Sequence, residues 1–140
     1  MFSDSTLFEN DYFKVTIPPG ESIVTVVRSS KSFESAAAAR AACNPMLTSL
    51  DNLGRRHHYL LLDSRQAVSK NDPEYENWFR SFRRDLVVDF PRVAYLVQTV
   101  AGQMQAKRLL QADGVFSRAD VFASPVFATA YLRNSGATLR

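Results

Sequence analysis

Asp63 is the side chain best placed for chemistry, because it ends a short apolar run (residues 59–62) and opens a polar loop that reaches Asp72. This order indicates a buried strand, a loop and a helix start, an end of an α/β sheet where sites are usually built. A carboxylate there could accept a phosphoryl group or bind a metal ion. Alternatively, it accepts hydrogen bonds from the amides of its own loop.

The residues that such reactions need as partners are missing from the sequence. A receiver-type phospho-acceptor needs further acids to hold magnesium, and no adjacent pair of acids follows the first predicted strands. His57 and His58 would point to opposite faces of a strand, and Cys43 is the only cysteine, which excludes a multi-cysteine zinc site. Glycine-rich phosphate loops and Gly-x-Ser-x-Gly steps are also missing. We therefore expect no catalytic residue, metal or cofactor, and a core position for Cys43.

Arginines form the remaining group of candidates. Arg80, Arg83 and Arg84 follow Asp72 on the predicted helix, and further basic pairs occur at 55–56 and 107–108. These side chains could form a basic face for an acidic or phosphorylated partner, or for an anionic membrane surface. They could equally be a solvated helix face whose cations complement the helix dipole. Both interpretations stay open.

Length and composition favour one soluble globular domain. The chain has 140 residues, of which 46% are hydrophobic and 22% charged, with a net charge of +3. That excess is small for a nucleic-acid binder, and no apolar run is long enough to span a membrane. The N-terminus lacks the basic region of a secretory signal, and the single cysteine favours a reducing compartment. We expect a cytoplasmic protein with flexible residues 1–11, one domain over 12–132 and a flexible tail over 133–140.

Hydrophobic periodicity predicts alternating strands and helices after an initial hairpin. Pro45 should kink or split the first helix, Ser32 should cap it and Gly54 should end it. Asp72 is a good N-cap for the second helix, whose first residue is Pro73. The predicted order is a hairpin over 12–28, a helix over 32–53, strands over 58–62, 92–97 and 119–122, and helices from 73, over 101–112 and over 124–132.

Four stretches carry a resemblance to a known family: LLLDSRQA, NDPEYENW, FPRVAYLVQTVAGQMQAKRL and DVFASPVFATAYL. Together they resemble the SpoIIAA-like (STAS) domains of bacteria, from about residue 12 to residue 132. The resemblance implies an α/β fold with a mixed sheet of about five strands and helices packed mainly on one face. The class includes anti-anti-sigma regulators that bind a partner kinase, stressosome and transporter-associated modules, and a related SEC14-like branch that binds lipids.

The sequence departs from the regulatory members of that family at their phosphorylation step. Those members carry a phosphorylatable Ser or Thr in an Asp-Ser-Ser-Gly-like step that opens the helix. This chain has Asn71, Asp72 and Pro73 near that position, so Ser64 and Ser69 are the nearest hydroxyls. We expect a fixed acidic cap at Asp72 in place of the usual phospho-switch.

The resemblance implies a non-enzymatic regulatory or scaffolding module of a bacterial signalling pathway. Its partner would be another protein, such as a regulator, kinase or sensor, with a homodimer left open and no nucleic acid involved. The alternative is a lipid or small apolar ligand bound in a SEC14-like pocket between helices and sheet. The expected partner-binding residues are Asp63, Ser64, Arg65, Ser69, Asn71, Asp72, Arg80, Arg83 and Arg84.

Overall fold

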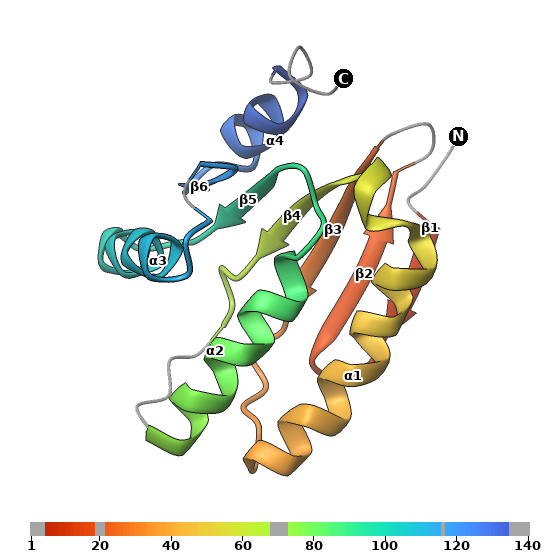
Figure 1. Ribbon diagram of the computed structural model, residues 1–140, viewed down its shortest axis with the longest axis vertical. Helices are drawn as coiled ribbons and strands as arrows, with labels where there is room; N and C mark the ends of the chain where they lie inside the picture. Colours follow the sequence, from red (N-terminus) through yellow and green to blue (C-terminus); the bar gives the residue numbers. More distant parts are fainter. Residues whose placement is uncertain (1–4, 19–21, 68–72, 116, 135–140) are drawn as a thin grey trace.

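The computed structural model describes residues 5–18, 22–67, 73–115 and 117–134, and it is an α/β protein, as the sequence predicts. Figure 1 shows a twisted sheet with helices on both of its faces. The elements are β1 (Ser5–Glu9), β2 (Phe13–Ile17), β3 (Ile23–Arg28), α1 (Ala36–Leu53), the short 3-10 helix η1 (Arg55–His57), β4 (Tyr59–Asp63), α2 (Pro73–Val87), β5 (Val93–Leu96), α3 (Val100–Ala112), β6 (Ala119–Phe122) and α4 (Pro125–Asn134).

The strands lie in the order in which they occur in the chain, as one sheet of six strands. β1, β2 and β3 are antiparallel neighbours, whereas β3, β4, β5 and β6 run parallel. The predicted hairpin is therefore present as β2 and β3. The sheet has six strands, and not the expected five, because β1 pairs with β2. The register of this pair shifts between Thr6 and Phe8.

β1 lies inside the segment 1–11 that we expected to be flexible. The strand is exposed along most of its length, with Phe8 partly buried against the core. The apolar and polar residues of an exposed edge strand need not alternate, so periodicity gave no sign of it. The expectation of a flexible segment is thus wrong for Ser5–Glu9, which backbone pairing to β2 orders.

The three parallel connections place their helices on one face of the sheet. Crossovers between parallel neighbours are right-handed, so successive steps in one direction keep to the same side. Buried residues of α1, α2 and α3 accordingly join one core cluster with Val15, Val24 and Leu60. α4 packs on the other face, where its Ala128 and Leu132 meet a smaller cluster from β3, β4 and β5.

α1 differs from the sequence prediction at its start and in its middle. The N-cap is Ser35, whose side chain accepts an N–H from the first turn, and not Ser32. Pro45 lies inside one continuous helix, so the predicted alternative of two separate helices is wrong. Gly54 ends α1 with a φ of 97°, a conformation that glycine adopts without strain, as predicted. The buried stripe that holds α1 on the sheet runs through the proline and consists of Ala39, Ala42, Cys43, Met46 and Leu50.

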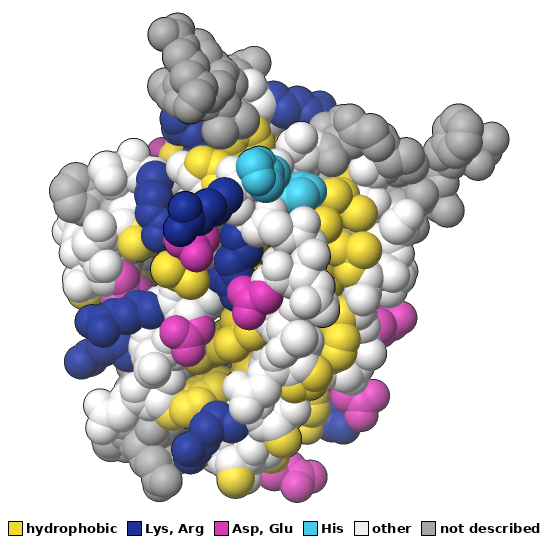
Figure 2. Space-filling model, turned by 45° about the vertical axis from the view of Figure 1, so that its right-hand side comes forward, with side chains coloured by type: hydrophobic (Ala, Val, Ile, Leu, Met, Phe, Trp, Pro, Cys, Tyr) yellow, Lys and Arg dark blue, Asp and Glu magenta, His cyan; other side chains and the backbone are white. Residues whose placement is uncertain are grey.

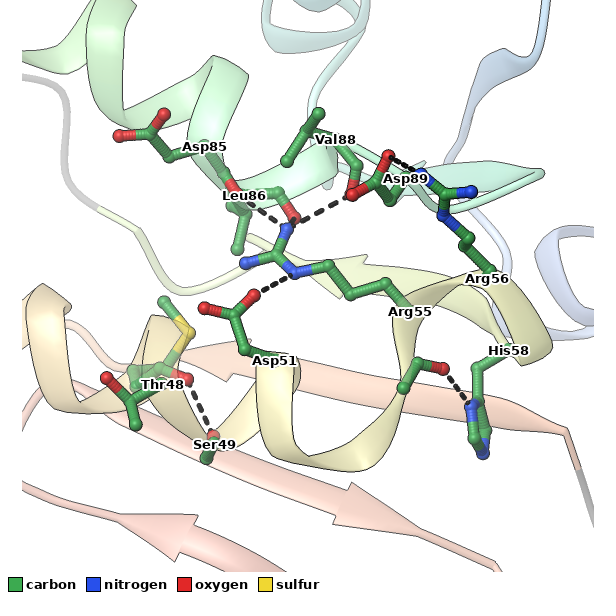
Figure 3. Close-up of polar contacts among 12 residues, drawn as sticks. Thr48, Ser49, Asp51, Arg55, Arg56, His58, Asp85, Leu86, Val88 and Asp89 are labelled. Carbon is green, nitrogen blue, oxygen red and sulfur yellow. Dashed lines mark hydrogen bonds and ion pairs between the residues drawn. The ribbon is translucent and has the colours of Figure 1, made fainter.

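Arg55 lies between α1 and β4, and its side chain caps the C-terminal end of α2 (Figure 3). Its Nη1 donates to the carbonyl oxygens of Asp85 at 2.6 Å, Leu86 at 3.1 Å and Val88 at 3.1 Å, and its Nε donates to Asp51 at 2.8 Å. The side chain is only 6% exposed. A buried guanidinium is tolerated here because its donors face carbonyl oxygens that have no partner within the helix.

Arg118 reaches the same helix end from the segment before β6. Its Nη1 donates to the carbonyl oxygens of Val87 at 3.0 Å and Phe90 at 2.8 Å. Asp89, with a φ of 68°, turns the chain out of α2 through the left-handed region. Two arginines from different crossovers thus satisfy the carbonyl oxygens around this turn, where the helix dipole also favours cations.

Replacing Arg55 by Met should lower the free energy of unfolding by about 2–4 kcal/mol, because it leaves buried carbonyl oxygens without a donor. The matched control is Arg56→Met. The Arg56 side chain is 80% exposed and pairs with Asp89 at 3.7 Å, so its loss should cost less than about 0.5 kcal/mol. Urea denaturation of both variants measures the difference, and equal losses would contradict the structural role assigned to Arg55.

Candidate functional site

The carboxyl ends of β3, β4, β5 and β6 lie at one edge of the sheet, which we call the carboxyl edge. Each of these strands is followed by a helix, so the starts of α1, α2, α3 and α4 all lie near this edge. Asp63 is the last residue of β4 and therefore sits in the middle of the edge. Ligand sites of open α/β sheets lie outside the carboxyl ends of the strands.

The Asp63 carboxylate is fully engaged by its own loop. Its Oδ1 accepts hydrogen bonds from the backbone N–H of Arg65 at 3.2 Å and from Arg65 Nε at 3.0 Å. Its Oδ2 accepts from Arg65 Nη2 at 2.8 Å. Of the arrangements considered from the sequence, the structure thus has the one in which the carboxylate binds its own loop. We name this pair the Asp63–Arg65 corner.

Hydrogen bonding and charge both keep the Asp63 carboxylate ionised. Burial of the carboxyl group acts to raise its pKa, but the hydrogen bonds and charge of Arg65 outweigh burial and lower the pKa below the ordinary value. The loop is also tied to the sheet, because the Ser64 N–H donates to the Leu96 carbonyl at 2.9 Å and the Ala67 N–H donates to the Ser64 carbonyl at 3.1 Å. The corner is thus a preformed feature that exposes Arg65 to solvent.

The predicted arginines of α2 separate into exposed and buried residues. Arg80 and Arg84 are exposed. Arg84 lies 11 residues beyond Pro73, which places it about 16 Å along the helix from its start and far from the Asp63–Arg65 corner. The predicted positions Ser69, Asn71 and Asp72 lie outside the described residues.

Arg83 is not a surface residue, so its assignment as a supporting charge for partner binding is wrong. Its side chain is 8% exposed and that of Asp113 is 6% exposed. Nε lies 2.9 Å from Asp113 Oδ2 and Nη2 lies 3.1 Å from Oδ1, a bidentate pair that joins α2 to the end of α3. Burial first, and the Asp113 charge second, raise the pKa of the nearby Tyr95 to about 12.

The face that carries both histidines does not form a single basic patch. Figure 2 shows basic and acidic side chains interspersed over this side of the molecule. Arg55 is buried beneath it, and Arg56 lies beside Asp89. Among the described residues, no group of three or more His, Cys, Asp or Glu side chains comes close enough to hold a metal ion.

A set of exposed apolar side chains at the carboxyl edge was missed by the sequence analysis. Val100 and Met104 of α3 are 73% and 54% exposed, and Val126 and Phe127 of α4 are 73% and 68% exposed. Ala106, Leu110, Ala128 and Leu132 make the buried contacts of these two helices instead. We call the four exposed residues the α3/α4 apolar edge. Adjacent apolar residues at 125–127, which cannot all face the sheet, were the available signal.

A groove of about 420 Å³ runs beside β6, between α3 and α4. Its lining mixes apolar, polar and charged side chains, and it is open to solvent. This differs from the enclosed apolar pocket that the lipid-binding alternative requires. The lining residues are Arg92, Lys107, Leu110, Gln111, Ser117, Ala119, Asp120 and Tyr131.

Comparisons with protein-family models, with curated proteins and with solved structures found no match for this chain. A search of the described helices for a membrane span also found none of sufficient length and apolarity.

Replacing Arg65 by Gln should raise the pKa of the Asp63 carboxyl toward the ordinary value of about 3.9, since the charge that lowers it is gone. Carboxyl NMR during an acid titration measures this shift. Because the folded pKa is lowered, the pair stabilises the fold above about pH 4, by about 0.2–1 kcal/mol, and this contribution is lost as the pH falls through the folded pKa. Arg80→Gln is the control, and an equal pKa shift there would contradict the pairing.

The Cys43 thiol should not react with a disulfide reagent at pH 8 while the protein is folded. The side chain is 1% exposed, and burial raises its pKa to about 12 against the opposing effect of the Arg28 charge. Because the unfolded thiol ionises near pH 8.5, the fold should lose up to about 1.4 kcal/mol per pH unit above that value. Cys43→Ala should lack this slope. Rapid labelling of the native wild type would contradict the prediction.

Proposed function

We propose that this chain is a non-enzymatic, STAS-like regulatory module that binds a partner protein at its carboxyl edge. The observation that carries the proposal is the Asp63–Arg65 corner, which is held in place at the centre of that edge. The sequence resemblance supports the family assignment, and a mixed sheet with helical crossovers is compatible with it. The partner would be a regulator, kinase or sensor of a bacterial signalling pathway.

The state of the titratable groups favours binding over catalysis. Both Asp63 oxygens already accept hydrogen bonds from Arg65, so an incoming phosphoryl group or metal ion would have to displace the arginine. The Cys43 thiol is buried and has a strongly raised pKa, which disfavours the thiolate that acts as nucleophile. The Arg83–Asp113 pair lies in the interior and neutralises itself.

The corner offers a partner a defined chemistry. Arg65 is 40% exposed, whereas the Asp63 side chain is 13% exposed, so the arginine forms the outer part of the pair. Arg80 is also exposed, about two turns into the following helix. A carboxylate or phosphate group of the partner would complete this arrangement. Among the described residues, Ser64 is the serine or threonine hydroxyl nearest in sequence to the family's phosphorylation step. We propose that the module works without the usual phospho-switch.

The proposal is tested by affinity purification of the tagged full chain from its native host, followed by binding measurements with the recovered partner. Arg65→Glu should weaken binding about tenfold or more, because it replaces a charge-assisted contact by repulsion. Arg56→Glu is the matched control, since Arg56 is 80% exposed at the opposite edge. Equal binding by both variants would overturn the proposal.

Ser69 and Asp72 extend the same test into the segment outside the described residues. A Ser69→Ala/Asp72→Asn variant should also weaken binding, because both positions belong to the segment of the sequence that follows the Asp63–Arg65 corner. Unchanged binding by this variant in a pull-down would contradict the proposed contact surface. Co-purified lipid in native mass spectrometry would instead favour the small apolar ligand.

A further inference from the structure

Exposed apolar side chains concentrate in one region of the molecule. Among the described residues, six large hydrophobic side chains are exposed, and four of these form the α3/α4 apolar edge. Val100 and Met104 lie one turn apart on the same side of α3. Val126 and Phe127 lie in the first turn of α4. Such a concentration of large exposed apolar side chains is a candidate interaction site.

The exposed fractions of the four apolar side chains indicate which kind of partner surface can cover them. Val100, Val126 and Phe127 are each at least 68% exposed, so their tips protrude and do not line a hollow. α3 packs on one face of the sheet and α4 on the other, so the tips emerge on both sides of the edge. Figure 1 shows the two helices separated by β6. A soft, flat surface accommodates such separate protrusions without a matching groove.

The charge around the apolar edge has one dominant sign. α3 and α4 contain no acidic residue, and Lys107 and Arg108 of α3 are exposed. Of the two acids between 93 and 134, Asp113 is paired with Arg83 in the interior. The other, Asp120, is exposed and lines the same groove as Lys107, so basic side chains outnumber exposed acids on these elements without being alone. A second copy of this chain would bring like charges together, whereas an anionic surface would be attracted.

We infer that the α3/α4 apolar edge docks on the surface of an anionic lipid bilayer. Val100, Met104, Val126 and Phe127 enter the interfacial region, and the exposed cations Lys107 and Arg108 of α3 lie beside the headgroups. The contact is peripheral and reversible, since it depends on a few side chains and on charge. It uses other residues than the proposed partner binding, which depends on Arg65 and the segment that follows it.

Co-sedimentation of the full chain with vesicles tests the inference, using phosphatidylcholine alone and phosphatidylcholine with phosphatidylserine. The wild type should bind the anionic vesicles more strongly, and salt should weaken that binding. Val100→Ser/Phe127→Ser should reduce binding about tenfold or more, because two inserted side chains are lost. Lys107→Glu/Arg108→Glu should remove the preference for phosphatidylserine.

Val88→Ser is the matched control, because Val88 is 46% exposed beyond the far end of α2. It should bind vesicles like the wild type, and circular dichroism should show that every variant is folded, since all the substituted side chains are exposed. The inference is overturned if the wild type does not sediment with anionic vesicles, or if Val88→Ser loses as much binding as the Val100→Ser/Phe127→Ser variant. It is also overturned if the apolar variant changes only self-association or the capture of a protein.

Discussion

The carbonyl oxygens at the end of α2 need donors that the helix itself does not provide, and two arginines supply them. Arg55 comes from the connection between α1 and β4, and Arg118 from the connection between α3 and β6. Because both converge on one helix end, α2 is tied to the crossovers on either side of it. The negative end of the helix dipole explains why two guanidinium groups can lie there, partly or fully removed from water.

Arginines have different surroundings at the two ends of the parallel strands. At the amino ends of the parallel strands, arginines serve the structure, and Arg55 points inward. At the carboxyl edge, Arg65 faces solvent, and the starts of α3 and α4 present apolar residues. The Arg55 side chain is buried and the Arg65 side chain is partly exposed because only Arg55 has several buried carbonyl oxygens within reach. The interior pair of Arg83 and Asp113 adds a second fixed contact between α2 and α3.

Much of the fold was predictable because its signals are local. The hairpin of β2 and β3, the strand over 119–122 and the stop at Gly54 follow from alternation and from glycine, and all are present. β1 was missed because an exposed edge strand has no buried face to impose alternation. The N-cap of α1 is Ser35, whereas the sequence analysis predicted Ser32. Either serine can cap a helix, and the packing of the buried stripe of α1 selects between them.

The position of Asp63 in the fold was predictable from the sequence, but the contacts of its side chain were not. The sequence by itself determined the order of the elements and the position of Asp63 at a strand end, because periodicity and turn residues report on each element alone. The tertiary structure decided that Arg65 engages Asp63, that Arg83 is buried against Asp113, and that Val100 and Phe127 remain exposed. A residue of a helix is buried only where another element packs against it. That packing depends on contacts between segments far apart in the sequence, which local sequence patterns do not contain.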